Sequence, residues 1–486
     1  MVLQTIIYPN ECCLQKEIYY QSKVDIVQKE GIVYVPENTE ISFLSYMNMF
    51  DVDLWKQYTS ISKIVFKSEV CGRGKFVIRS INEHEKISIA EKKFDNPNES
   101  FICEELEIEL AEIGGKIYFE LVSYSNVGIK QASFETLSGQ KQNRDIDIAL
   151  NICTYQRKHY IDNTIRKLKT SRFFDKKEEL YGKLSVYIVD NGSELDDVSE
   201  KRIKVFHNKN TGGAGGFKRG LEEIRKTKYS HVIFADDDIE FLSESFYRVY
   251  AFLAHLKEEY TDYPIAGRMF RLDERWRQYT ATEIWNRGEI IHIGFNSDMR
   301  NKEQVIRSNL GTNGQYGGWW FCCYPMSFVT VNDPLPVFIH CDDVEYGLRN
   351  GNVPIIINGV QVWHETYEYR KSQMVEYYDV RNSMIVNAMY TEVDAKDVLF
   401  DWKKRITDKH IVEDYVGEYL LIKALHNFIR GPRWLKKNGN KQVKIPSQRS
   451  SLYIKYVNKI YWRYCQWALL NRYILIKNKY REEMKK

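Results

Sequence analysis

The first 140 residues alternate apolar and polar positions in short runs: KIVFKSEV (63–70), GKFVIRSI (74–81), KISIAEKKF (86–94) and GKIYFELVSYS (115–125). A period of two places successive side chains on opposite faces of a strand, so each run predicts one half-buried strand. Gly, Asn and Asp between the runs are typical of turns that join antiparallel strands. We therefore predict an N-terminal β-rich domain, a sandwich or barrel, over residues 1–140.

The pattern changes at DIDIALNICTYQR (145–157), where a continuous apolar run leads into a polar loop. Similar runs follow in KLSVYIVDNGS, IKVFHNKN and SHVIFADDD, with helix-like segments between them. Buried strands that alternate with helices predict an α/β fold with a doubly wound sheet, whose ligands lie at the carboxyl ends of the strands. We assign residues 141–390 to this domain and the mostly helical residues 391–486 to a third region.

Composition and cysteine spacing exclude several protein classes. Apolar residues make up 43% and charged residues 28% of the chain, as in an ordinary globular protein. The nine cysteines lack C-x-x-C or Cys/His spacing, which favours reduced thiols over disulfides or a zinc site. The N-terminus lacks the pattern of a signal peptide, and no run of about 18 apolar residues occurs. We therefore expect a cytoplasmic protein.

Four glycines lie in NTGGAGG (210–216), before the predicted helix FKRGLEEIRK (217–226). Each glycine costs backbone entropy, so the cluster implies a tight turn or the close approach of a ligand to the bare backbone. The ligands that fit such a turn before a helix are a phosphate or a sugar. A plain structural turn is the alternative.

Three consecutive carboxylates, Asp236, Asp237 and Asp238, follow an apolar run. Side chains two positions apart in an extended segment point the same way, so Asp236 and Asp238 form a candidate site for Mg²⁺ or Mn²⁺. A metal ion held by two carboxylates typically bridges a diphosphate and neutralises a leaving group. The alternative is a solvated acidic turn.

Other polar side chains lie at the ends of predicted elements. Asp342 and Asp343 begin a helix in FIHCDDVEYGLR, where they are either helix-capping acids or a general base and its neighbour. His364 ends the strand in VPIIINGVQVWHE and is either a structural histidine or a ligand. Trp319 and Trp320 in GQYGGWWFCCYP are either core residues or a surface on which a sugar ring stacks.

The net charge of +4 is unevenly distributed, because residues 421–486 contain 17 Lys and Arg against 2 Asp and Glu. Near its end an apolar stripe recurs at helical spacing, with cations on another face. The stripe comprises Tyr453, Val457, Ile460, Tyr464 and Trp467, and the cations are Lys455, Lys459 and Arg463. The stripe packs on the rest of the protein or contacts an anionic membrane, and the basic excess favours the membrane.

Taken in order, the segments CTYQR, VDNGS, NTGGAGG, DDD, GGWW, DDVEYGLR, VWHE and YYDVRN resemble the motifs of bacterial galactofuranosyltransferases. These are inverting glycosyltransferases of family 2 with a GT-A fold, of the type that polymerises galactan. The resemblance covers residues 145–385, and the β-rich and helical regions on either side also resemble that family's three-part layout.

The resemblance implies a role for each matching residue. Donor-binding residues would be Thr154, Arg157 and Asp190 for the uridine, with Asn210, Gly212, Gly213 and Asp237 facing the rest of the donor. Asp236, Asp238 and His364 would bind the metal ion, Asp343 would be the general base beside Asp342, and Trp319 and Trp320 would line the acceptor site. One position departs from the pattern: Asp379 stands where polymerising relatives carry a histidine near the donor phosphates.

We therefore predict a metal-dependent inverting transferase that moves galactofuranose from UDP-galactofuranose to a hydroxyl of a lipid-linked acceptor or growing glycan. Its partners would be the UDP-sugar, the acceptor, Mn²⁺ or Mg²⁺ and the anionic inner face of the cell membrane. We expect no nucleic-acid partner. A homo-oligomer is compatible with the sequence. A UDP-hexopyranose or dTDP-rhamnose is an alternative donor for the same fold. A non-catalytic glycan-binding protein and a nucleic-acid-binding protein are alternatives from other classes.

Overall fold

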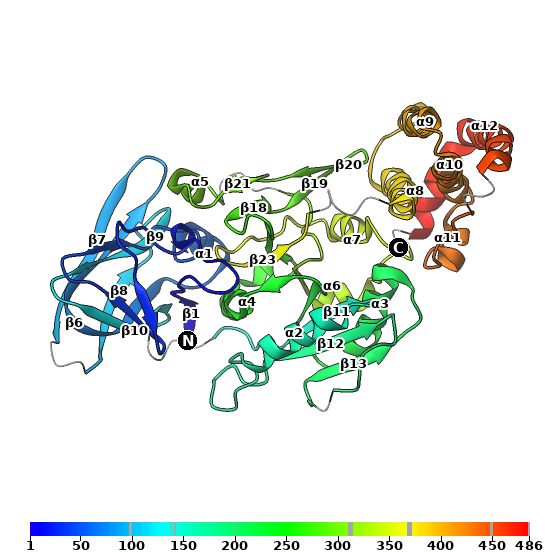
Figure 1. Cartoon of the computed structure of the whole chain (residues 1–486). Coiled ribbons are helices and arrows are strands. Elements are labelled where there is room, and N and C mark those ends of the chain that lie inside the picture. The colour runs from blue at the N-terminus through cyan, green and yellow to red at the C-terminus, as the bar shows by residue number, and fades with distance from the viewer. Residues whose placement is uncertain are drawn as a thin grey trace.

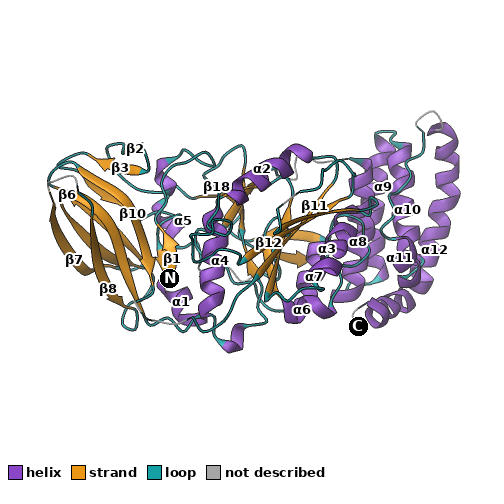
Figure 2. Ribbon diagram, turned by 90° about the horizontal axis from the view of Figure 1, so that it is seen from below, coloured by secondary structure: helices purple, strands orange, loops and turns teal. Residues whose placement is uncertain are grey.

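The computed structural model describes residues 1–486 except 97–99, 138, 140–141, 199, 310–313, 367–371, 448–450 and 485–486. A β-rich N-terminal part, a central α/β part and a helical C-terminal part follow one another along the molecule (Figure 1). Strands β6 to β10 gather at one end and helices α8 to α12 at the other (Figure 2). This arrangement confirms the predicted fold class.

The N-terminal part is built on one long strand, β6 (Lys63–Ile81). Its first half pairs with β8 (Ile102–Glu109) and β10 (Val127–Glu135), and its second half with β7 (Lys86–Asn96) and β9 (Lys116–Ser123), all antiparallel. Around these lie β1 (Val2–Thr5), β2 (Val27–Lys29), β3 (Ile32–Val35), β4 (Glu40–Ser42), β5 (Phe50–Asp51) and helix α1 (Val52–Tyr58).

The two runs KIVFKSEV and GKFVIRSI were predicted as separate strands, and the structure corrects this, because both lie in β6. Gly72 and Gly74, which resemble turn residues in the sequence, are needed inside the strand for close packing. Gly72 has a φ angle of +96°, and a Cβ atom there would collide with the carbonyl of Asn126; at Gly74 it would collide with the Phe94 ring. The glycines therefore let β6 pass from one set of strand partners to the next.

The central sheet has strand order β13 (Ile203–His207), β12 (Leu184–Asp190), β11 (Ile148–Thr154), β14 (His231–Asp236), β22 (Cys322–Pro325) and β16 (Ile265–Ala266). The first four are parallel, and β22 and β16 pair antiparallel. The helices around it are α2 (Lys158–Lys169), α3 (Gly212–Ile224), α4 (Ser243–His255), α6 (Met326–Val331) and α7 (Asp342–Asn350). Alternate residues of β11 face different helices: Ile148 shares a core with Leu168 of α2, whereas Ala149 shares one with Leu221 of α3.

A second sheet has strand order β15 (Glu240–Phe241), β23 (Gln361–His364), β17 (Arg268–Arg271), β18 (Arg277–Thr280) and β21 (Ser297–Asp298). Beside it lie the hairpin of β19 (Glu283–Asn286) and β20 (Glu289–His292) and the short helix α5 (Lys302–Ile306). Glu240 of β15 pairs with Trp363 of β23. This register brings the end of β23 next to the loop that follows β14.

The helical part consists of α8 (Gln373–Tyr390), α9 (Ala395–Ile411), α10 (Tyr415–Ile429), α11 (Pro432–Asn438) and α12 (Ser451–Met484). Buried side chains of α8 share one core with those of α9, α10 and α12, so this layer begins before the expected boundary at residue 391. Every cysteine is a free thiol. Among the described helices, α12 included, none combines the length and apolarity needed to cross a bilayer.

Candidate active site

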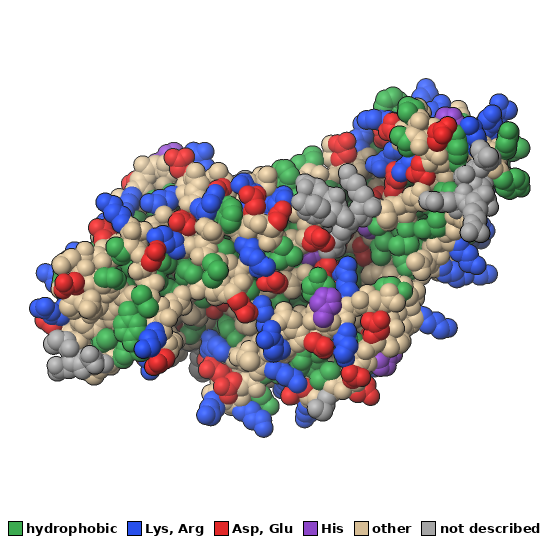
Figure 3. All heavy atoms as spheres, in the orientation of Figure 1, with side chains coloured by type: hydrophobic (Ala, Val, Ile, Leu, Met, Phe, Trp, Pro, Cys, Tyr) green, Lys and Arg blue, Asp and Glu red, His purple; other side chains and the backbone are tan. Residues whose placement is uncertain are grey.

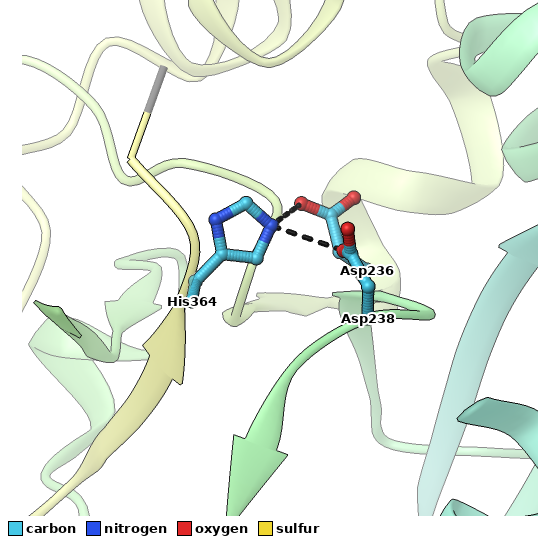
Figure 4. Close-up of side chains that lie close together, drawn as sticks. All are labelled: Asp236, Asp238 and His364. Carbon is cyan, nitrogen blue, oxygen red and sulfur yellow. Dashed lines mark hydrogen bonds and ion pairs between the residues drawn. The ribbon is translucent and has the colours of Figure 1, made fainter. Parts of the chain in front are cut away.

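Two aspartates, one at the end of β14 and one in the turn after it, meet the histidine that ends β23 at the carboxyl edge of the central sheet. His364 Nε2 lies 3.0 Å from Asp238 Oδ1 and 3.5 Å from Asp236 Oδ2 (Figure 4). One ligand atom from each of the three residues lies within 4.8 Å of the other two. The structure therefore brings together the three residues that the sequence analysis named as metal ligands.

This donor set fits a divalent cation. Carboxylate oxygens suit Mg²⁺ and Mn²⁺, and a neutral imidazole nitrogen is a common additional ligand. Asp236, Asp237 and Asp238 place three carboxyl groups here, and Arg157 shares its single positive charge between Asp237 and Asp238. Asp238 and His364 are buried while Asp236 is about one-third exposed (34%), so the cluster opens toward solvent on the Asp236 side.

Asp237, the middle aspartate of the triplet, is held by one residue at the end of β11 and one in the loop that follows. Thr154 Oγ1 donates a hydrogen bond to Asp237 Oδ2 (2.6 Å), and Arg157 Nη1 donates to Asp237 Oδ1 (3.0 Å) and Asp238 Oδ2 (2.7 Å). Burial raises the pKa of Asp237 to about 6, and the negative charge of Asp238 adds to this effect. Thr154 and Arg157, predicted as uridine contacts, thus anchor the acidic loop, a link that no sequence pattern indicates.

Asp190 ends β12 and organises the loop that follows it. Its carboxylate accepts hydrogen bonds from the backbone N–H groups of Gly192 (2.8 Å), Glu194 (2.7 Å) and Leu195 (2.8 Å). Burial alone would raise the pKa of Asp190, but these N–H groups hold it below its ordinary value. The carboxylate therefore fixes the conformation of the loop that follows β12.

The glycine cluster lies inside α3, which begins at Gly212 rather than at Phe217 as predicted. Gly212 has a φ angle of +72°, and a Cβ atom there would collide with the carbonyl of Phe338. Asn210 Oδ1 accepts a hydrogen bond from the Gly212 N–H (3.1 Å). Both residues, predicted to face the donor, therefore make contacts within the protein.

The other glycines of α3 differ in what they face. A Cβ atom at Gly216 would collide with Cys153 Sγ of β11, so this glycine lets the helix pack closely on the sheet. A Cβ atom at Gly213 would lie 3.6 Å from Asp342 Oδ2, an ordinary contact distance. Gly213 is therefore the glycine of the cluster that lies beside the acids of the site.

Asp342 and Asp343 form the first turn of α7, and Asp343 Oδ1 accepts the Val344 N–H (2.7 Å). Burial raises the pKa of both carboxyl groups. Their mutual repulsion and the charge of Glu283 raise the pKa of Asp343 further. The charge of Asp236 also raises the pKa of Asp342.

The tryptophan pair does not form the acceptor surface that was predicted. Trp319 and Trp320 are only 4% and 1% exposed. Trp319 stacks on Phe234 with ring centroids 4.6 Å apart, and Trp320 Nε1 donates to the Gly267 carbonyl (2.9 Å). Both indoles are core residues, the alternative weighed from sequence, and their burial leaves no ring face for a sugar.

The segment YYDVRN lies in α8 and clamps the loop that precedes α7, a role that the sequence analysis missed. Arg381 Nη2 donates to the Val337 carbonyl (2.6 Å). Asn382 Nδ2 donates to the carbonyls of Ile339 and His340, both at 2.8 Å. The α8 motif therefore fixes the position of the loop that leads to Asp342 and Asp343.

Comparisons with known proteins agree with these features. Residues 12–136 match the family described as Galactofuranosyltransferase 2 N-terminal, and residues 150–325 match Glycosyl transferase family 2. The first match corresponds to the β-rich part. The second runs from β11 to β22 and so includes the aspartate triplet.

Two relatives are named galactofuranosyltransferase GlfT2. The protein of Mycobacterium tuberculosis (strain ATCC 25618 / H37Rv) is 24% identical over 430 residues, which cover 81% of this chain and 66% of the relative. That of Mycolicibacterium smegmatis (strain ATCC 700084 / mc(2)155) is also 24% identical, over 82% of this chain and 65% of the relative. The matched region thus spans slightly less than two thirds of the length of these relatives.

Among solved structures, a mannosyltransferase from Pyrobaculum calidifontis in complex with GDP-Man and Mn²⁺ aligns at 11% identity and a TM-score of 0.31. The alignment covers 72% of this chain and 92% of that protein, but the similarity is too low to transfer any residue's role. The two domain matches lie in the same order as the β-rich and α/β parts of the structure. The β-rich part therefore matches the N-terminal domain of galactofuranosyltransferase 2, and the α/β part is a glycosyltransferase domain of family 2.

Proposed function

We propose that the protein is an inverting, metal-dependent glycosyltransferase that moves galactofuranose from UDP-galactofuranose to a hydroxyl of a glycan or lipid-linked acceptor. The observation that carries this proposal is the cluster of Asp236, Asp238 and His364, whose ligand atoms all lie within 4.8 Å of one another. The match to the Galactofuranosyltransferase 2 N-terminal family and the galactofuranosyltransferase names of the relatives support the choice of donor sugar.

In this proposal, Asp236, Asp238 and His364 hold Mn²⁺ or Mg²⁺. When bound, such an ion supplies positive charge against a diphosphate leaving group. Gly213 provides an open stretch of backbone beside the donor. Burial lowers the local dielectric constant, which strengthens each of these electrostatic contacts.

Asp343 acts as the general base and accepts the proton of the acceptor hydroxyl. The new bond forms at the sugar C1 atom as the bond from C1 to the phosphate oxygen breaks on the opposite side, so the configuration inverts. A carboxyl group with a raised pKa is a stronger base than an ordinary one, which favours this role. Asp342, the neighbouring acid, contributes to that raised pKa.

We also propose that α12 binds an anionic membrane surface peripherally, near a lipid-linked acceptor. The predicted stripe is on the outside of the protein: Tyr453, Ile460, Tyr464 and Trp467 are exposed, whereas the opposite face of α12 packs in the helical core. Hydrophobic side chains lie beside Lys and Arg at this end of the molecule (Figure 3). An exposed apolar stripe with flanking cations fits an anionic lipid surface.

A donor panel tests the proposed activity. UDP-galactofuranose, a UDP-hexopyranose and dTDP-rhamnose are supplied with an oligosaccharide acceptor, and nucleotide release is measured against acceptor-free reactions. We expect acceptor-dependent UDP release with UDP-galactofuranose. Preference for another donor would reassign the sugar, and release equal to background with every donor would favour a non-catalytic glycan-binding protein.

A further inference from the structure

A histidine and a carboxylate form a pair beside the acids of α7. His340 Nδ1 lies 2.8 Å from Asp379 Oδ1. His340 belongs to the loop before α7, whereas Asp379 belongs to α8. Both side chains are partly exposed, so the pair reaches solvent and does not lie in the core.

The loop that carries His340 is held in a strained conformation. Phe338, His340 and Cys341 have φ angles of 71°, 64° and 61°, in the left-handed region that non-glycine residues seldom occupy. Such strain persists only where surrounding contacts enforce it, and it concentrates at functional sites. Arg381 and Asn382 of α8 enforce it here through their hydrogen bonds to the loop carbonyls.

This loop connects two walls of the candidate active site. The carbonyl of Phe338 accepts a hydrogen bond from the N–H of Ala214 in the first turn of α3 (3.1 Å). Asp342 follows His340 by two residues and faces Gly213 of the same helical turn. The loop that carries His340 and Asp342 therefore lies against the start of α3.

The surroundings of His340 and Asp342 are rich in negative charge. A diphosphate could therefore bind there only beside positively charged groups. Arg157 is engaged by Asp237 and Asp238. Burial lowers the pKa of His340, but the hydrogen bond to Asp379 and the charges of Asp379, Asp342 and Asp343 outweigh this effect and raise it overall. The imidazole at this wall is thus suited to carry a positive charge.

We propose that His340, oriented by Asp379, donates a hydrogen bond to the diphosphate of the nucleotide-sugar and stabilises the leaving nucleoside diphosphate. This inference rests on the proposed function and adds a donor contact to it. As the C1–oxygen bond breaks, its electron pair passes to the phosphate oxygen. The acceptor oxygen bonds to C1 and its proton passes to Asp343, while His340 keeps its own proton.

Calorimetric binding of UDP and of uridine, at equal Mg²⁺ concentration, separates a diphosphate contact from a general effect. We expect His340→Gln to weaken UDP binding by about tenfold or more, the effect of losing one charge-assisted hydrogen bond, and to leave uridine binding unchanged. Asp379→Asn keeps a hydrogen-bond acceptor for Nδ1 but removes the charge, and should weaken UDP binding in the same direction. His410→Gln is the matched control, because His410 pairs with Glu418 (3.4 Å) within the helical part.

Equal UDP affinity in wild type and His340→Gln would overturn the inference, as would an equal loss for UDP and uridine, which would indicate a structural role for the loop. If His340→Gln does not fold, Asp379→Asn decides between the same outcomes. If the wild-type protein binds neither UDP nor uridine, the proposed function itself fails. The two failures are therefore distinguishable.

Discussion

His364 Nε2 lies 3.0 Å from Asp238 Oδ1, although 126 positions separate the two residues in the chain. The pairing of β15 with β23 creates this proximity, because β15 begins two residues after Asp238 and His364 is the last residue of β23. A short antiparallel pair thus completes the cluster that β14 begins. The end of β14 in the central sheet and the turn after it supply the aspartates, and β23 of the second sheet supplies the histidine.

Asp343→Asn should lower kcat by at least about 10², because it removes the general base, and should leave UDP affinity nearly unchanged. Steady-state kinetics and calorimetry measure the two effects separately. Asp342→Asn, one residue away, serves as the matched comparison. A comparable loss of kcat in Asp342→Asn, with Asp343→Asn active, would reverse the assignment of the base.

The same base predicts the direction of the pH dependence. Burial and neighbouring carboxylates raise the pKa of Asp343, so this group takes up its proton at a higher pH than an ordinary carboxyl group. A protonated carboxyl cannot accept the acceptor proton, so kcat/KM should fall as the pH is lowered through the raised pKa. A wild-type profile that stays flat down to pH values near the ordinary aspartate pKa of about 3.9 would contradict this.

Two glycines of α3 should respond differently to alanine. Gly216→Ala should destabilise the fold, because its Cβ atom collides with Cys153 Sγ. Gly213→Ala should fold with unchanged or slightly higher stability, since alanine favours a helix by about 1 kcal/mol over glycine, but should weaken UDP binding. Thermal unfolding and calorimetry check both variants, and wild-type UDP affinity in Gly213→Ala would remove this glycine from the donor site.

Trp320→Ala should lower the free energy of unfolding by about 3–5 kcal/mol, as expected when a buried aromatic side chain is deleted. Trp467→Ala is the control, because Trp467 is 59% exposed and should change stability by less than about 0.5 kcal/mol. Chemical denaturation measures both. A fully stable Trp320→Ala with a raised KM for acceptor would instead restore the acceptor-surface interpretation.

The fold class and the two aspartate ligands could be predicted because their signals are local, whereas the metal role of His364 was implied only by the resemblance to galactofuranosyltransferases. Apolar runs that end in polar residues mark strand ends. The alternation used to pair Asp236 with Asp238 does not extend to Asp238, because β14 ends at Asp236 and Asp238 lies in the turn that follows. The continuity of β6 across Gly72 could not be predicted, because glycine occurs both in turns and where strands pack closely. The contacts of Arg157 with Asp237 and of Asp379 with His340 join segments far apart in the chain, and no local pattern encodes them.

Membrane binding by α12 is tested by substitution rather than truncation, because Ala468, Leu469 and Tyr473 on its inner face are buried in the helical core. Ile460, Trp467 and Ile474 are exposed, and replacing all three by Ser should reduce co-sedimentation with phosphatidylserine vesicles at low salt. High salt should release the wild-type protein. Equal recovery of wild-type and substituted protein in the lipid pellet would show that this stripe is not the anchor.

The central claim, metal-dependent transfer from the Asp236, Asp238 and His364 cluster, is tested most directly by one assay of UDP release from UDP-galactofuranose with acceptor. Wild-type protein and Asp238→Ala are compared with Mn²⁺, with Mg²⁺ and after removal of divalent ions by EDTA. Asp196→Ala removes an exposed carboxylate that pairs with Lys158, and this variant serves as the control. We predict turnover by wild type and the control only with a divalent ion, and none by Asp238→Ala under any condition; full wild-type turnover in EDTA would contradict the account.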